Sequence, residues 1–129
     1  MTYRIVYPAH KPRRFYSEAA GEYKKRLTRY CKVTRVNTIT PAEGKELTVA
    51  LSPDGTRITS EGMADRFLSA ETGGIINRIT FLLNKDISAH FDEMWALTTV
   101  NVPADLTITL LLEQIYRAQK IMHHEPYHK

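Results

Sequence analysis

The chain has 129 residues, of which 43% are hydrophobic and 25% charged, and its formal net charge is +4. This length and composition predict one globular domain over residues 1–129 and exclude a two-lobed enzyme with separate cofactor and substrate domains. The apolar runs are far shorter than the roughly 20 residues of a membrane helix, the single cysteine excludes an internal disulfide, and the first residues lack a signal peptide's apolar stretch, so we expect a cytoplasmic protein.

The first third of the chain alternates between strand-favouring and helix-favouring patterns. Residues 2–7 are predicted to form a strand, which Pro8 ends because proline cannot donate to a sheet ladder. Residues 12–30 are predicted to form a helix, since apolar side chains recur at spacings of three and four. A second strand is predicted at residues 32–39, and a loop follows it as far as Lys45.

Turn residues mark the boundaries in the middle of the chain. A third strand at residues 47–51 runs into Pro53-Asp54-Gly55, which is a strong turn sequence. A helix is predicted to begin near Thr59 or Ser60, with an acidic residue in its first turn, and to end at Gly73-Gly74.

The last part of the chain contains the longest predicted helix. Residues 75–83 form a fourth strand that is nearly all apolar from Ile79 onward, so we expect it to be central and buried on both faces. A short helix is predicted at residues 88–95 and a fifth strand at residues 97–102. The final helix covers residues 103–123, with one apolar stripe made of Ile108, Leu111, Leu112, Ile115, Ala118, Gln119 and Met122.

This alternation of strands and helices implies an α/β fold with a mostly parallel sheet. Parallel sheets bind ligands beyond the carboxyl ends of their strands. We therefore expect a binding site in the loops after Leu51, after Leu83 and around Val102.

Positive charge is concentrated near the N-terminus. Residues 11–32 contain eight Lys or Arg and two Glu, so this segment carries +6 and the rest of the chain about −2. Because Tyr23 and Tyr30 lie among the basic residues, the segment could follow a phosphate backbone and stack on bases. The alternative is an ordinary solvated helix face.

Isolated reactive residues give only weak signals. His123, His124 and His128 are close in sequence, but Pro126 interrupts the helical spacing that a metal site there would need, so no metal is predicted. Cys31 is interpreted as a packing residue rather than a nucleophile. The chain has no Gly-x-Ser-x-Gly, Walker A or Gly-x-Gly-x-x-Gly motif.

The C-terminal third carries a specific resemblance. Its blocks are Leu112-Glu113-Gln114-Ile115-Tyr116-Arg117-Ala118, Lys120-Ile121-Met122 and Pro126-Tyr127-His128-Lys129. These blocks resemble the end of the ribosomal large-subunit pseudouridine N3-methyltransferase family (RlmH), which belongs to the SPOUT class. Two earlier segments are similar to the family in the same order, residues 22–30 and residues 60–64.

The resemblance implies a fold, a reaction and partners. The fold would be a SPOUT-like domain with a mostly parallel five-stranded sheet, helices on both faces and a C-terminal trefoil knot. The enzyme would act as a homodimer that transfers a methyl group from S-adenosylmethionine to N3 of a pseudouridine in ribosomal RNA. Such a transfer depends on positioning and on charge stabilisation.

The resemblance also implies site residues by position. Tyr127 and His128 would reach the target, within one chain or across the dimer, and His128 would assist proton removal because histidine titrates near neutral pH. The cofactor residues would be Leu51, Leu83, Asn84, Leu97, Thr98, Thr99, Val100, Asn101 and Val102. The RNA-binding residues would be Arg13, Arg14, Lys24, Lys25, Arg29 and Arg117, the last of which would contact phosphate or brace the tail.

The chain departs from the family at the active site. A glycine-rich loop that the family has after its fourth strand is replaced here by residues 84–88, and none of the last 55 residues is glycine. Ala104 stands where the family has histidine, and Ile108 where it has arginine. The family's helix between strands two and three is also missing. These losses leave an alternative open, a catalytically inactive homodimer that binds RNA, the ribosome or another ligand.

Overall fold

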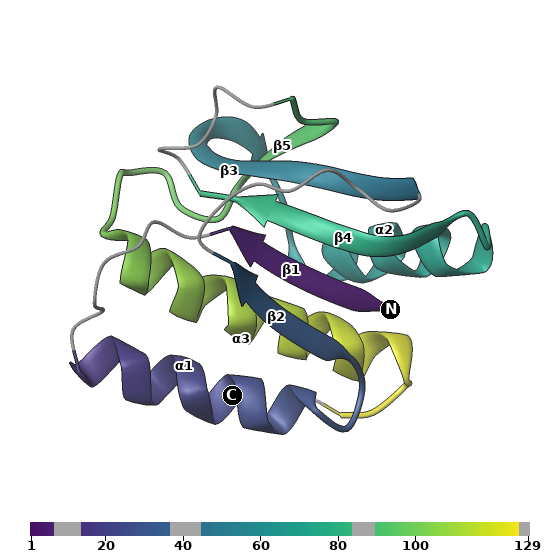
Figure 1. The fold of residues 1–129 in the computed structure, drawn as a ribbon, viewed down its shortest axis with the longest axis horizontal. Helices are drawn as coiled ribbons and strands as arrows, with labels where there is room; N and C mark the ends of the chain where they lie inside the picture. Colours follow the sequence, from purple (N-terminus) through teal and green to yellow (C-terminus); the bar gives the residue numbers. More distant parts are fainter. Residues whose placement is uncertain (7–13, 37–44, 84–89, 127–129) are drawn as a thin grey trace.

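The computed structural model describes residues 1–6, 14–36, 45–83 and 90–126. Over these residues the chain forms five strands and three helices (Figure 1). None of the described helices is long and apolar enough to cross a membrane. The elements in chain order are β1 (Thr2–Val6), α1 (Arg14–Leu27), β2 (Lys32–Val36), β3 (Lys45–Arg57), α2 (Ser60–Thr72), β4 (Ile76–Leu82), β5 (Glu93–Ala96) and α3 (Ala104–Met122).

The strands form one parallel sheet in the order β2-β1-β4-β3-β5, which confirms the predicted α/β class. All three described helices lie on the same face of this sheet, with α3 packed between α1 and α2 (Figure 1). The prediction of helices on both faces is therefore wrong for the described residues. The connections from β2 to β3 and from β4 to β5 contain only residues 37–44 and 83–92, which is short for a helical crossover between parallel strands.

The hydrophobic core lies between the sheet and the helix layer. Alternate residues of each strand face the helices, so Tyr3 of β1 and Phe81 of β4 are fully buried. Phe67 of α2 packs against both rings, and its centroid is 4.9 Å from that of Tyr3. The buried Tyr3 hydroxyl accepts a 2.9 Å hydrogen bond from Gln119 Nε2, which ties α3 to the sheet.

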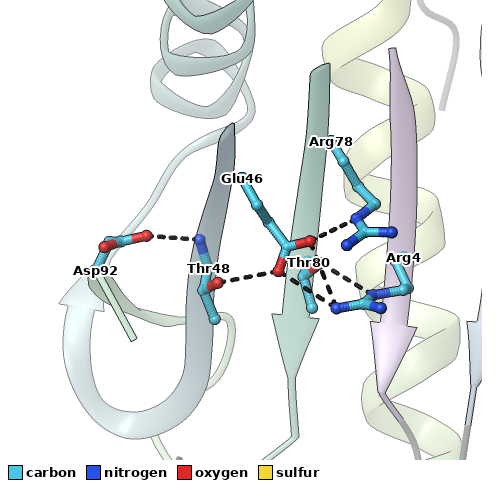
Figure 2. A network of polar contacts seen from close by, with 6 residues as sticks. All are labelled: Arg4, Glu46, Thr48, Arg78, Thr80 and Asp92. Carbon is cyan, nitrogen blue, oxygen red and sulfur yellow. Dashed lines mark hydrogen bonds and ion pairs between the residues drawn. The ribbon is translucent and has the colours of Figure 1, made fainter. Parts of the chain in front are cut away.

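The opposite face of the sheet carries a polar network (Figure 2). The carboxylate of Glu46 on β3 accepts hydrogen bonds from Arg4 of β1, at 3.3 Å, and from Arg78 of β4. Arg4 also donates to Thr80 Oγ1 at 3.2 Å, and the Thr48 hydroxyl donates to Glu46 at 3.4 Å. Charged hydrogen bonds thus join three neighbouring strands on the face that the described helices leave uncovered.

The two predicted elements after β4 are wrong. Glu93–Trp95, the end of the helix expected at residues 88–95, instead belong to strand β5, which pairs with Val49–Leu51 and again with Thr56 and Arg57. Residues 97–102, expected to be the fifth strand, are irregular. Strand β3 is also longer than predicted and curls through the predicted turn (Figure 1). An added Cβ at Gly55 would lie 2.8 Å from the Met94 carbonyl, so the curl depends on the absence of a side chain there.

The predicted boundaries of α2 are confirmed. Thr59 caps the helix by accepting a hydrogen bond from the backbone N–H of Gly62 at 2.9 Å. Gly73 ends the helix, and Gly74 has a φ of 67°, a left-handed conformation that glycine adopts without strain. Strand β4 is central, with its last four residues buried, as predicted.

Candidate functional site

A cavity of about 220 Å³ lies beyond the carboxyl ends of β4 and β5 and beside Leu51, where β3 begins its curl, in the region where the alternating pattern predicted a site. We call it the edge cavity. Its wall includes seven of the nine residues expected to contact a cofactor: Leu51, Leu83, Leu97, Thr98, Val100, Asn101 and Val102. Thr99 is not among the lining residues, and Asn84 lies outside the described residues. The carboxyl ends of β4 and β5 and the start of the curl of β3 thus lie around one cavity.

Five further residues line the edge cavity, and of these only Ala104 was expected near the active site, as the position where the family has histidine. Ser52 and Pro53 follow Leu51 directly, where β3 begins its curl. Ala104, Thr107 and Leu110 come from the first turns of α3 and share one side of the helix through their spacing of three. The spacing of three is visible in the sequence. The apolar pattern of α3, however, places Leu110 beside the buried stripe and gives no sign that it lines a cavity.

The edge cavity combines apolar walls with a stretch of irregular backbone. Leucine side chains from three different segments, at positions 51, 83 and 97, suit the faces of a flat aromatic ring. Residues 97–102 belong to no helix or strand, so their peptide groups are not used in a regular ladder. Thr98 Oγ1 donates to the Val100 carbonyl at 2.6 Å, which holds this segment in a tight local bend.

Tyr127 and His128 lie outside the described residues, but the chain leading to them is described as far as Pro126. The backbone N–H of Glu125 donates to the Lys120 carbonyl at 2.8 Å, and His124 has a φ of 56°. These features end α3 with a turn. At this end of the helix the Glu125 carboxylate meets the side chains of Arg29, Tyr30 and Lys120, and we call these four residues the Glu125 cluster.

The Glu125 cluster joins the C-terminal end of α3 to the turn between α1 and β2. The Tyr30 hydroxyl donates to Glu125 Oε2, Lys120 Nζ lies 3.3 Å from the same oxygen, and Arg29 Nη2 lies 3.4 Å from Oε1. The hydrogen bond from Tyr30, with the nearby cations, lowers the pKa of Glu125. Desolvation and the bond to Glu125 raise the pKa of Tyr30, and the hydrogen bond with Tyr30 raises the pKa of Lys120.

The residues predicted to bind RNA have different surroundings. Lys24 and Lys25 are exposed on α1, whereas Arg29 joins the Glu125 cluster although its side chain is 69% exposed. Arg117 of α3 forms a 2.7 Å ion pair with Glu113 one turn earlier. Arg13 lies outside the described residues, and of Arg14 only the helical backbone is described.

Other reactive groups do not form a second centre in the part of the chain that the structure describes. Burial raises the pKa of the Cys31 thiol to about 11, which disfavours the thiolate that a nucleophile needs. Among the described residues, no three His, Cys, Asp or Glu side chains are grouped closely enough to hold a metal ion. His90 lies 3.5 Å from the carboxylate of Asp92.

Comparison with known proteins gives consistent matches over most of the chain. The family described as predicted SPOUT methyltransferase matches residues 37–128. Ribosomal RNA large subunit methyltransferase H 1 of Thermoanaerobacter sp. (strain X514) is 30% identical over 135 positions that cover all of both chains. The methyltransferase H of Deinococcus deserti is 34% identical and that of Shouchella clausii 28%; these alignments cover 84% and 90% of this chain and 86% and 92% of the relatives. The chain therefore belongs to the SPOUT methyltransferase family, among the relatives of ribosomal RNA large subunit methyltransferase H.

Proposed function

We propose that this chain is an S-adenosylmethionine-dependent methyltransferase that acts on the RNA of the large ribosomal subunit. Its relatives are named for that activity, and the similarity to one of them runs through the whole chain. Within this class we propose N3 of a pseudouridine as the acceptor, as the C-terminal blocks imply. The observation that carries the proposal is the edge cavity, where seven of nine expected cofactor residues share one wall.

The edge cavity fits the nucleoside part of the cofactor. Leu51, Leu83 and Leu97 would enclose the adenine, and the irregular backbone of residues 97–102 would offer peptide groups to the edge of its ring. The volume of about 220 Å³ is below the roughly 300 Å³ at which small-molecule sites usually begin. We therefore assign only the nucleoside to the described residues. When bound, S-adenosylmethionine supplies a methyl group on a positively charged sulfur.

The acceptor nitrogen must lose its proton before it can take the methyl group. His128 is the proposed base, because a histidine is largely neutral near pH 7 and can accept that proton. Tyr127 is proposed to hold the target base beside it. Both residues would also align the acceptor with the methyl group, and such alignment supplies much of the rate in these transfers.

The distance between the edge cavity and the tail supports a site built from two protomers. Leu110 is the last cavity residue of α3, and Lys120, to which Glu125 is bonded, lies ten residues later, about 15 Å along the helix. His128 follows Glu125 by three residues, which span at most about 10 Å when extended. The backbone of one tail thus ends short of Leu110 in the same chain. We propose a homodimer in which each tail serves the partner's cavity.

Two further proposals concern the knot and the surface that binds RNA. We propose that the segment from β4 to α3 forms the trefoil knot of the family, with residues 97–102 as one of its loops. We also propose that Lys24 and Lys25 bind RNA phosphates, because both are exposed on α1 and the segment around them, residues 11–32, carries a net charge of +6.

Two measurements on the unmodified protein test the proposed function. Calorimetric titration with S-adenosylmethionine should give saturable heat, and the cofactor should raise the melting temperature because it binds only the native state. Large ribosomal subunits from cells that lack this methylation should then accept labelled methyl groups, and mass spectrometry should find them on N3 of one pseudouridine.

The outcomes separate the enzyme from its alternative. No heat and no thermal shift at millimolar cofactor would contradict the methyltransferase proposal. The inactive homodimer would then be favoured if the protein still bound ribosomal subunits with a steep dependence on salt. The observation behind that alternative is the sequence after Leu83, which lacks the family's glycines.

A further inference from the structure

The C-terminal end of α3 carries more polar contacts than its own termination requires. Three backbone bonds already close the helix, from His123 to Gln119, from His124 to Ile121 and from Glu125 to Lys120. The side chain of Glu125 takes no part in them. It instead receives donors from Tyr30, Arg29 and Lys120, and the first two belong to the turn between α1 and β2. This carboxylate therefore links the start of the tail to a distant part of the fold.

Tyr30, the donor in this link, is itself held in place from two sides. Its ring lies 5.0 Å from that of His123 and 6.4 Å from that of Tyr116. Lys120 Nζ lies 5.8 Å from the Tyr30 ring centre and 5.5 Å from that of Tyr116, so the cation sits near two aromatic rings as well as the carboxylate. A hydroxyl on a ring packed in this way has a defined direction, which makes the bond to Glu125 a fixed point rather than a loose surface contact.

We propose that Glu125 is a positioning residue, and that with Tyr30 it fixes the point from which the tail carrying Tyr127 and His128 leaves the fold. This inference rests on the proposed function, because the tail matters for catalysis only if it carries the catalytic groups. Glu125 lies two residues before Tyr127 and three before His128, so little chain separates the fixed point from the groups it would direct. A displacement of about 1 Å at a reacting group can cost roughly 100-fold in rate.

Cofactor binding should not depend on the bond between Glu125 and Tyr30. The edge cavity contacts α3 only through Ala104, Thr107 and Leu110, at the other end of the helix. Loss of the Glu125 link should therefore lower turnover while the affinity for S-adenosylmethionine stays the same. A change that merely loosened the whole fold would weaken both.

The test uses E125Q and Y30F, with E22Q as the matched control. E22Q makes the same change of charge at an exposed i,i+4 ion pair, where Glu22 lies 3.2 Å from Arg26. We expect E125Q and Y30F to lower kcat for methyl transfer roughly 10- to 100-fold with an unchanged Kd for the cofactor. The double variant should lose little more than the worse single variant, because the two side chains act as one unit. E22Q should keep kcat within about twofold.

A second readout follows the tail without any catalysis. A fluorophore on K129C, in a C31S background, should show lower nanosecond anisotropy in E125Q and Y30F than in the parent, and no change in E22Q. Unchanged anisotropy in folded E125Q and Y30F would overturn the positioning role, as would a loss of kcat matched by an equal loss of cofactor affinity. If the parent transfers no methyl group at all, the proposed function fails, while the anisotropy still decides whether Glu125 fixes the tail.

Discussion

The two ends of α3 are built for different tasks. At its N-terminal end, Ala104, Thr107 and Leu110 face a cavity with mostly aliphatic walls. At its C-terminal end, Lys120 joins Tyr30 and Glu125 in a cluster of charges and aromatic rings. The 19 residues of the helix make a rod of about 28 Å. One rigid helix thus separates the place suited to a ligand from the place where the tail begins, and each end can be altered alone.

Among the changes that affect one end of α3 and not the other, the largest effect should come from substitution of Gly55, which shapes the strand beside the edge cavity. In G55A the new Cβ would meet the backbone of Met94 at 2.8 Å, so β3 or β5 must shift. We expect a loss of about 1–3 kcal/mol in the free energy of unfolding, as for other overpacked sites, together with weaker cofactor binding.

The matched control for G55A is G21A, which should change stability in the opposite direction. Gly21 lies within α1, and an added Cβ there meets nothing within 4 Å. We expect G21A to stabilise the protein by about 0.5–1 kcal/mol, since alanine is the better helix former. Urea unfolding measures both variants, and equal stability of G55A and G21A would contradict the tight packing at the curl of β3.

A smaller effect, confined to the cavity end, is expected for L97N. The amide would replace an apolar wall without a prepared partner, and affinity for S-adenosylmethionine should fall roughly tenfold or more. L68N provides the comparison, because Leu68 is 46% exposed on α2 and lies outside the cavity lining. If calorimetry gave the same Kd for both variants, the edge cavity would not be the cofactor site.

A still smaller effect is expected for RNA binding. Replacing Lys24 and Lys25 by glutamine should weaken binding to ribosomal subunits several-fold and reduce the slope of log affinity against log salt by about two. Cofactor affinity should stay unchanged, because neither lysine lines the edge cavity. An unaltered salt slope would show that α1 does not face the RNA.

The smallest effect should be a pH dependence of the stability that the Glu125 cluster contributes. The pKa of Glu125 is lowered, so its contribution to stability is present above the ordinary value of 4.5 and is lost as the pH falls through the folded value. The pKa values of Tyr30 and Lys120 are raised, so their contributions are present below about 10 and are lost as the pH rises. The difference in melting temperature between the parent and E125Q should therefore be largest near neutral pH and shrink on either side. A difference that did not vary with pH would contradict this.

Local signals explain which elements could be predicted. The ends of α2 follow from the cap at Thr59 and from Gly73-Gly74, and the central place of β4 follows from its nearly all-apolar sequence from Ile79 onward. Strand β5 could not be predicted because Glu93-Met94-Trp95-Ala96 favours a helix locally, and only its pairing with β3 makes it a strand.

The candidate site was partly predictable from topology. In a parallel sheet the carboxyl ends of the strands share one edge, so the order of strands along the chain is enough to bring Leu51, Leu83 and Leu97 together. The Glu125 cluster could not be predicted in this way, because Tyr30 and Glu125 are 95 residues apart and no local pattern in the sequence pairs them. The position of all three described helices on one face of the sheet was not predicted either. The resemblance suggested helices on both faces, but the connections from β2 to β3 and from β4 to β5 are short for helical crossovers.

The most direct test mixes two inactive variants of this protein. H128A lacks the proposed base, and L97N binds the cofactor weakly, so each homodimer should transfer few methyl groups when S-adenosylmethionine is kept below the Kd of the parent. If cavity and tail come from different protomers, unfolding and refolding the two together should restore about a quarter of the parent activity, because half of the dimers then contain one intact site. A mixture that remains as inactive as its components, while the parent treated in the same way recovers, would contradict the two-protomer site.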